Sequence, residues 1–529
     1  MQQQYVVSYP DPRLATDTTT ATPAPAPSNL IDSGLGLLMV LVALFVMFQY
    51  ATSGVLHPDF HLHILNGEWI LGHYALPEKD AFSWTAGGAS YVLTQWGGEV
   101  LITVAWLLAG GWGTKVLTAL VAVALLYTMH RAAYIQFNDI FGSIATTVLL
   151  AGGTLLSLQA QPEIFSYLLF AITVLVAEHW RENGHNRMLL TLPAILALWA
   201  NMDSAFLIGV AYLWIATIGM GAGLVLKNRS LSAFWKVSPF AIAALAGSLA
   251  TLINPYGVGA WDASISSVRS AASHSAIITD WLVPSLSNQA GVQLAIVMVM
   301  MAAVAGFSKR RLRVEEFLVF AAFLVFGFIA RKNVPFFMIA MVPILSRLGA
   351  ATTVSDWLRQ STSRKSSLLA QAFVIAIMLP LLMLTGVAIK DRGEKTFRRA
   401  FSVAALDFLV ANKMTDRVMH GFDVGGYFAY STGMKVFADR RTQLYGVPFV
   451  ERYVNAMNGR PGYAEFIAAW NPKSILVPND SPLKALLSAT GQYGVVFDSG
   501  SDAILAKRGV GYDALITQYQ HLPIKVALH

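Results

Sequence analysis

The chain has 529 residues, of which 55% are hydrophobic and only 13% are charged, and its mean hydropathy is +0.54. These values exclude an ordinary soluble globular protein and predict a polytopic α-helical membrane protein. The sequence contains no cysteine, which excludes a disulfide framework, a thiolate metal site and a cysteine nucleophile. The net charge of +7 falls largely in short loops between apolar runs, so it indicates membrane orientation rather than nucleic-acid binding.

The apolar runs predict about eleven membrane-spanning helices. Residues 1–29 end in a stretch rich in Thr, Pro and Ala that cannot bury an apolar core, so we expect a disordered cytoplasmic tail. The run Leu30–Tyr50 is long enough to cross a bilayer and longer than the core of a signal peptide, so we expect an uncleaved first helix. The further expected spans are Gly113–Met129, Phe141–Ser157, Ile164–Ala177, Met188–Ala200, Ala205–Leu226, Val237–Ile253, Gly291–Phe307, Glu316–Ala330, Val334–Leu348 and Leu368–Ile389.

One segment, Leu93–Ala109, decides the orientation of everything that follows it. It is apolar enough to span, but its first half contains Gln95 and Glu99, so we expect an interfacial helix rather than a crossing. With this segment uncrossed, fifteen Lys and Arg residues fall on one side of the membrane and five on the other, up to the last span. Because cytoplasmic loops are enriched in Lys and Arg, we expect the N-terminus inside and residues 390–529 outside.

Polar side chains concentrate on the expected outer face. The inner loops are basic and otherwise plain, whereas the outer loops and helix ends carry carboxylates, amides and bases, starting in the long first loop at 51–112. Charges at membrane depth are costly unless they face water or one another, so we expect a cavity for a polar or anionic substrate. Its candidate residues are Asp59 as the catalytic residue and His61, His63, Asp80, Glu99, Glu163, Asn201, Asp203, Asn254, Tyr256, Asp280, Arg331 and Lys332 as substrate-binding residues.

Several of these side chains have a chemical role and a structural alternative. Asp59 is suited to act as a general base on an acceptor hydroxyl, or it is a solvent-exposed carboxylate at a helix end. His61 and His63 alternate in a polar loop, which favours hydrogen bonding over metal ligation. Arg331 and Lys332 occupy a short outer turn, where they are suited to a phosphate, to lipid headgroups or to a salt bridge with an outer carboxylate.

Two further motifs lie at expected helix ends. Asn201 and Asp203 are suited to line the cavity or to cap the next helix. In the sequence NPYG at Asn254, the proline ends a helix and the glycine permits a turn. A structural role is therefore favoured there over substrate contact by Asn254 or Tyr256.

The C-terminal part, residues 390–529, alternates between helical and strand patterns and predicts a small soluble α/β domain. The sequence GFDVGG at Gly421 lacks the spacing of a dinucleotide-binding loop and is predicted to be a turn. Asp439, Arg440 and Arg441 are suited to contact an acceptor or cap the cavity, and a local salt bridge is an equal alternative. The expected elements are helices at Phe401–Ala411, Val447–Met457, Tyr463–Trp470 and Leu483–Ala489, and strands at Arg417–His420, Val436–Asp439, Ser474–Pro478, Tyr493–Phe497 and Ala503–Lys507.

The first outer loop resembles that of a group of bacterial multi-spanning proteins. The resemblance rests on DFHLHILNGEWILGHYALPEKDAFSWTAGG at Asp59 and on TQWGGEVL at Thr94. The group is similar to part of the GT-C glycosyltransferase superfamily, and the resemblance covers residues from about 30 to 510. The later segments that match in order are QPEIFSYLL at Gln161, LWANMDSAFLIG at Leu198, NPYG at Asn254, ITDW at Ile278, ARKNVPFF at Ala330 and VFADRRTQLYG at Val436.

The resemblance implies a GT-C-like domain at residues 30–389 and transfer of a sugar from a polyprenyl-phosphate donor. The acceptor would be a glycan, lipid or protein on the periplasmic face of a bacterial inner membrane. Asp59 would be the catalytic carboxylate of an inverting reaction, and Arg331 and Lys332 would hold the donor phosphate. A divalent metal is left open, and the expected partners are the lipid donor, membrane lipids and envelope-biosynthesis proteins. A non-catalytic scaffold of envelope-polysaccharide assembly and a polar-solute transporter are the alternative functions.

Overall fold

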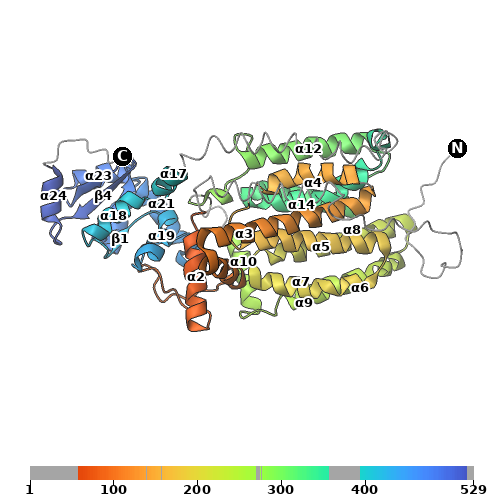
Figure 1. Ribbon diagram of the computed structural model, residues 1–529, viewed down its shortest axis with the longest axis horizontal. Helices are drawn as coiled ribbons and strands as arrows, with labels where there is room; N and C mark the ends of the chain where they lie inside the picture. The colour runs from red at the N-terminus through yellow and green to blue at the C-terminus, as the bar shows by residue number, and fades with distance from the viewer. Residues whose placement is uncertain are drawn as a thin grey trace.

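The computed structural model describes residues 57–138, 140–155, 158–269, 275, 277–356 and 393–520. These residues are mostly helical: long helices lie side by side in a bundle, and a region with a small sheet lies beyond one end of the bundle (Figure 1). The expected tail at 1–29 and the expected spans Leu30–Tyr50 and Leu368–Ile389 lie outside the described residues.

Five helical segments of the described residues are long and apolar enough to cross a membrane. They are α3 (Trp96–Phe137), α5 (Glu163–Asn183), α8 (Phe206–Asn228), the run Leu231–Ala250, which joins η1 (Leu231–Val237) to α9 (Ser238–Ala250), and α12 (Gln289–Phe307). The other bundle elements are α4 (Ile140–Leu155), α6 (Asn186–Leu189), α7 (Thr191–Met202), α10 (Val258–Arg269), η2 (Thr279–Trp281), α13 (Val314–Ile329), η3 (Arg331–Asn333) and α14 (Val334–Gly349).

The bundle helices match most of the expected spans. Helices α4, α8, α12, α13 and α14 cover their predicted runs to within a few residues, and α5 extends its run at the carboxyl end. The predicted span Met188–Ala200 is divided at Leu190 into α6 and α7. Pro193 lies in the first turn of α7. Proline has no backbone N–H, and it is tolerated there because the N–H groups of the first turn have no acceptor within the helix. The count of eleven spans includes two runs outside the described residues and stays a prediction.

Helix α3 contains the segment that was expected to be interfacial. At 1.5 Å per residue, its 42 residues would measure about 63 Å, roughly twice the hydrocarbon thickness of a bilayer. The helix is broken at Ala109 (φ −148°) and Gly110 (φ 54°), and glycine adopts the second of these conformations without steric cost. The break divides a segment of interfacial length from a longer one that can cross, so the interfacial placement of Leu93–Ala109 stays a prediction.

Helix α14 is buried on all sides at the centre of the bundle. All residues from Val334 to Leu348 are buried, and the helix packs against α3, α4, α5 and α13. Phe170 of α5 stacks on Phe323 of α13, with ring centroids 5.3 Å apart, and meets Phe336 of α14 edge-on at 5.6 Å. Because this packing fixes the start of α14, it also fixes the short turn η3 that precedes it.

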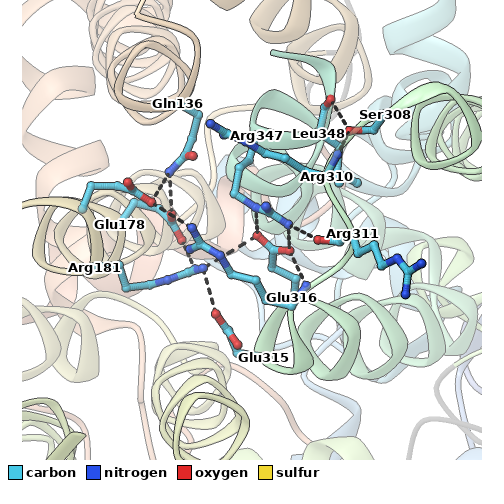
Figure 2. Close-up of polar contacts among 12 residues, drawn as sticks. Gln136, Glu178, Arg181, Ser308, Arg310, Arg311, Glu315, Glu316, Arg347 and Leu348 are labelled. Carbon is cyan, nitrogen blue, oxygen red and sulfur yellow. Dashed lines mark hydrogen bonds and ion pairs between the residues drawn. The ribbon is translucent and has the colours of Figure 1, made fainter. Parts of the chain in front are cut away.

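A network of buried ions joins the last turns of α5 to the start of α13 and the end of α14 (Figure 2). Arg181 pairs with Glu178 at 2.6 Å and with Glu315 at 3.2 Å. The Arg347 guanidinium donates to both carboxylate oxygens of Glu316. These five side chains are at most 8% exposed, and they join α5, α13 and α14.

The C-terminal region, residues 393–520, is built on a four-stranded sheet with the order β1-β2-β4-β3. Strand β1 (Val418–Met419) is parallel to β2 (Ser474–Pro478), and β4 (Asp502–Lys507) is antiparallel to β2 and to β3 (Tyr493–Asp498). The helices are α17 (Gly393–Ala400), α18 (Val403–Ala411), α19 (Phe422–Thr432), α20 (Thr442–Tyr445), α21 (Val447–Met457), α22 (Tyr463–Trp470), α23 (Pro482–Ala489) and α24 (Asp513–Gln520).

Two predictions for this region are wrong. The sequence GFDVGG at Gly421 is not a turn, because Gly421 caps the helix α19. The predicted strand Val436–Asp439 does not join the sheet. Val436 instead forms an isolated bridge with Ser83 of the first loop.

The glycines of α19 explain why it packs so closely against two other segments. A Cβ atom on Gly425 would lie 2.2 Å from the Ala438 carbonyl oxygen, and one on Gly426 would lie 3.2 Å from Leu62 of α2 (Phe60–His73). Only glycine permits the first approach. The close packing brings the segment around Arg440 to the start of α2, which runs across the ends of the bundle helices (Figure 1).

Candidate functional site

A cavity of about 230 Å³ lies where the bundle meets the C-terminal region. It is enclosed by the start of α2, the start of α5, the α7–α8 junction, η2, η3 and the segment 440–443. Its polar lining residues are His57, Asp59, His63, Gln95, Gln161, Glu163, Asp203, Ser204, Ser264, Ser267, Asp280, Trp281, Lys332, Asn333, Arg440, Arg441, Thr442 and Gln443.

Asp59 stands at the N-terminus of α2 and faces a cation from the C-terminal region. Its carboxylate lies 3.1 Å from Nε of Arg440, and the side chain is 23% exposed. The Asp59 backbone N–H donates to Nδ1 of His57 at 3.3 Å. The other ring nitrogen, Nε2, lies 3.2 Å from the Asp280 carboxylate. His57 therefore links the backbone at the start of α2 to Asp280.

Arg440 holds three carboxylates at once. In addition to Asp59, it contacts Asp280 through Nη2 at 2.7 Å and Asp423 through Nη1 at 2.9 Å, and its side chain is 5% exposed. Burial alone would lower the pKa of Arg440, but the three carboxylates raise it above its ordinary value. The guanidinium is therefore a permanent cation at this site.

Asp280 is ionised in this arrangement. Burial raises the pKa of its carboxyl, but the hydrogen bond and charge of His57 and the charges of Arg440 and Lys332 outweigh that effect and hold the pKa well below its usual range. Lys332 contributes from η3, where its Nζ lies 3.7 Å above the centre of the Trp281 ring. No ion pair holds Lys332 within the part of the chain that the structure describes. Its charge is therefore available to a ligand.

The opposite wall presents two carboxylates. Asp203 accepts hydrogen bonds from the Ser166 hydroxyl at 2.6 Å and from the Ala205 backbone N–H at 3.1 Å, which fixes its orientation at the α7–α8 junction. Glu163 begins α5 and accepts from the Gln161 amide at 3.5 Å. The bond of Asp203 to Ala205 lies in the turn before α8, whose N-cap is Ala205 and which has no side-chain cap hydrogen bond, so the alternative that Asp203 caps the next helix is wrong.

Glu99 lies behind the cavity rather than on it. This carboxylate is completely buried and accepts from His63 at 2.8 Å, from the Asn66 amide at 3.0 Å and from the Gln95 amide at 3.4 Å. Because His63 and Gln95 line the cavity, Glu99 fixes the positions of two lining side chains from behind.

Asp80 acts through Arg441. It accepts from the hydroxyl of Ser83 at 2.6 Å and pairs with Arg441 at 2.7 Å, and Arg441 is also bonded to its neighbour Asp439 at 2.5 Å. Arg441 makes the local salt bridge, and both Arg440 and Arg441 line the cavity, so the Asp439–Arg441 segment combines the two alternatives.

Besides Glu99 and Asp80, five further candidate residues do not line the cavity. His61 is buried among aromatic rings, including those of Phe401 and Tyr427. Asn201 donates to the backbone of α7 and to the Ile253 carbonyl. The remaining three are Asn254, which closes its own turn, Tyr256 beside it, and Arg331, whose neighbour Lys332 occupies the cavity instead.

Comparison with known proteins identifies the fold. No protein-family model matches the sequence, and no curated protein matches it. The archaeal oligosaccharyltransferase AglB from Archaeoglobus fulgidus, solved with an inhibitory peptide and a dolichol-phosphate, superposes with a TM-score of 0.55 at 14% identity, covering 94% of this chain and 76% of AglB. An Archaeoglobus fulgidus oligosaccharyltransferase in the apo form gives 0.52 at 13% identity, with 84% and 69% covered. ArnT from Cupriavidus metallidurans in the apo state gives 0.52 at 14% identity, with 89% and 98% covered.

This chain has the GT-C fold. The superpositions extend over most of the chain and of the matched proteins, so the GT-C resemblance of the sequence is confirmed at the level of the fold. At these identities the superpositions establish the architecture and leave the chemistry of the site to its own residues.

Within the described ranges, no group of three or more His, Asp or Glu side chains is arranged to hold a metal ion. In the cavity, Asp59 and Asp280 are instead bound to the Arg440 guanidinium. No cofactor is established for this chain.

Asp423 is the site residue that the sequence did not indicate. The sequence predicts a turn at this position, whereas Asp423 lies in the first turn of α19 and pairs with Arg440 through Nη1, while Asp59 lies at Nε. The available signal was the pattern of an acidic residue followed by two glycines, which also fits a helix that packs closely through its second turn.

Proposed function

We propose that this chain is a membrane glycosyltransferase that moves a sugar from a polyprenyl-phosphate donor to an acceptor on the outer face of a bacterial inner membrane. The observation that carries the proposal is that Asp59 shares one cavity with two cations, Lys332 and Arg440, at the end of a GT-C bundle. The dolichol-phosphate bound in AglB gives independent support for a lipid phosphate as the donor group.

The proposed reaction is an inverting displacement at the anomeric carbon. The acceptor hydroxyl forms a bond to that carbon while the bond to the phosphate oxygen breaks, the hydroxyl proton passes to Asp59, and the phosphate leaves with the bonding electrons. Lys332 stabilises the leaving phosphate, because its charge is not held by a carboxylate. Asp203 and Glu163 accept hydrogen bonds from sugar hydroxyls on the opposite wall.

The placement of charged groups supports the proposed sidedness. The cavity lies beside the C-terminal region at the end of the bundle where α5 starts, and Arg181 of the ion network lies at the other end, near the last residue of α5. The second end carries the basic loops counted in the sequence, so it is the cytoplasmic end in this proposal. The cavity then opens toward the periplasm, where a lipid-linked sugar and an external acceptor can meet.

The proposal is tested with the full chain reconstituted in nanodiscs and polyprenyl-phosphate hexoses that carry a labelled sugar. Release of sugar to water or its transfer to added acceptors is measured, with and without Mg²⁺ or EDTA. We expect Asp59→Asn to lower the rate by about 100-fold or more, which is typical of a lost general base. Lys332→Met should mainly raise the donor KM, by about tenfold.

Arg440 variants separate the charge of this residue from its shape. Arg440→Gln should lower kcat strongly, whereas Arg440→Lys should retain part of it, because a lysine keeps the charge but cannot hold three carboxylates at once. Glu451→Gln, an exposed change on α21, is the control and should be fully active. Equal activity of Asp59→Asn and wild type, or flux of a polar solute into liposomes without any donor, would contradict the proposal.

A further inference from the structure

A second cavity, of about 340 Å³, adjoins the first through one ion pair. Asp423 lines this second cavity, and its carboxylate is bound to Arg440, which lines the first. The two cavities also share a wall segment, because Ile277 lines the second and Ile278 the first. A ligand that contacts Asp423 in the second cavity would therefore be linked to Asp59 through the Arg440 guanidinium.

The position of this second cavity in the sheet is typical of ligand sites. It lies at the carboxyl ends of the two parallel strands, where Gly421 and Phe422 follow β1 and Pro478 ends β2. Open α/β sheets bind ligands in the crevice outside the carboxyl ends of their strands. The volume is at the lower end of the range for small-molecule sites, which suits one or two sugar rings better than a polymer.

The charges around the second cavity offset one another. Asp423 is compensated by Arg440, and the remaining ionised lining residues are one cation, Arg399, and one carboxylate, Asp502. A site of this kind offers no excess positive charge to a phosphate or a carboxylate ligand. It favours a neutral ligand whose hydroxyl groups can donate to the carboxylates.

The walls of the second cavity are mainly apolar. Tyr453, Val454 and Met457 of α21 form one side, and Val477 of β2 forms another. A pyranose ring has both properties that this lining requires, an apolar C–H face and hydroxyl groups around its edge. An extended peptide is a poorer match, because the edge strand β1 has only two residues with which a peptide strand could pair.

We infer that the second cavity binds a neutral carbohydrate, and that this carbohydrate is the acceptor, or the end of the acceptor, in the transfer reaction. The acceptor role rests on the proposed function, whereas the binding of carbohydrate does not. The Asp423–Arg440 pair forms the boundary across which the acceptor hydroxyl approaches Asp59.

The inference is tested by saturation-transfer NMR on the full chain in nanodiscs, without donor. The probes are methyl glycosides of glucose, galactose, mannose and N-acetylglucosamine, together with cellobiose and maltose. We expect at least one of them to bind. Val454→Phe, which fills the cavity, and Asp502→Asn, which keeps the shape but removes a charge, should each weaken binding at least fivefold.

Two controls keep the result separate from folding and from catalysis. Glu451→Gln lies on the same helix as Val454 but outside the cavity and should bind like wild type, as should Asp59→Asn. The inference is overturned if none of the probes binds, if the cavity variants bind as tightly as wild type, or if a neutral Ala-Ser-Ala peptide binds where saccharides do not. Carbohydrate binding without sugar transfer by the wild type would support the binding site and contradict the proposed function.

Discussion

Asp59, Asp280 and Asp423 are held together by the single guanidinium of Arg440. Like charges repel, and the guanidinium between these carboxylates offsets that repulsion. One cation shared by three carboxylates leaves a net negative charge, which the nearby charge of Lys332 reduces but does not cancel. The charged groups of this cavity therefore come from both the bundle and the C-terminal region.

His61 provides a pH test at the scale of one residue. Burial among aromatic rings lowers the pKa of His61 to about 4, from a usual value of about 6.5 in an unfolded chain. Between these values the unfolded state binds more protons, so stability is present above pH 6.5 and is lost as the pH falls toward 4. We expect wild type to lose about 2 kcal/mol more than His61→Phe between pH 7 and pH 4.5. Thermal unfolding in detergent at the two pH values measures this difference, and equal losses would contradict it.

At the scale of elements, the packing of α19 is open to a direct test. Gly425→Val would place a side chain within 2.2 Å of the Ala438 carbonyl oxygen, so α19 or the segment after it must move. We expect a loss of about 1–3 kcal/mol of stability and a large loss of activity, because Arg440 follows this segment. Gly72→Ala on α2 meets nothing within 4 Å and should be neutral. Hydrogen exchange of α19 shows whether the helix has moved, and full activity of Gly425→Val would contradict the account.

The buried ion network of Figure 2 predicts a strong effect far from the cavity. Arg347→Met leaves the Glu316 carboxylate, 3% exposed, without its principal partner, and we expect a loss of about 3 kcal/mol or more. The double variant Arg347→Met, Glu316→Met should recover part of that loss, because no unpaired charge remains. Lys309→Met removes a pair whose lysine is 59% exposed and should cost less than about 1 kcal/mol. Thermal unfolding in detergent compares the stabilities of wild type, the two single variants and the double variant. Equal losses of stability in Arg347→Met and Lys309→Met would contradict the prediction.

The elements that could be predicted from the sequence are those whose residues follow a local period. The bounds of α21, α22 and β2 agree with the predicted ones, because their apolar spacing and flanking turn residues are local signals. The sequence does not predict helix α19, because Gly425 and Gly426 disfavour a helix locally. These glycines are needed for the close packing of α19 against Ala438 and Leu62, and that contact is not a local signal.

The same distinction applies to the site. Asp59, Asp280 and Lys332 could be assigned to one outer face from the membrane topology, and the cavity brings them together. Arg440 approaches Asp280 across 160 residues of sequence, and no local pattern specifies such a contact. Whether Arg331 or Lys332 enters the cavity depends on the course of the short turn η3, which the spacing of the spans does not determine.

At the scale of the whole molecule, the arrangement separates two polar regions by the length of the bundle. Helix α5 starts with Glu163 at the cavity and reaches Arg181 in the ion network 18 residues later, which corresponds to about 27 Å, close to the hydrocarbon thickness of a bilayer. Polar groups at both ends of an apolar helix of this length fix its depth in the membrane. In the proposed orientation, the two ends of the bundle face different compartments.

The absence of cysteine from the sequence permits a clean measurement of which compartment each end faces. Asp480→Cys adds a thiol at an exposed position of the C-terminal region, and Lys309→Cys adds one at an exposed position between α12 and α13. In spheroplasts, a membrane-impermeant maleimide should label the first variant at once and the second only after lysis, because the C-terminal region lies outside in the proposed orientation. The unlabelled wild type controls for background. The reverse pattern would place Asp59 and its cations in the cytosol, where an external acceptor could not reach them.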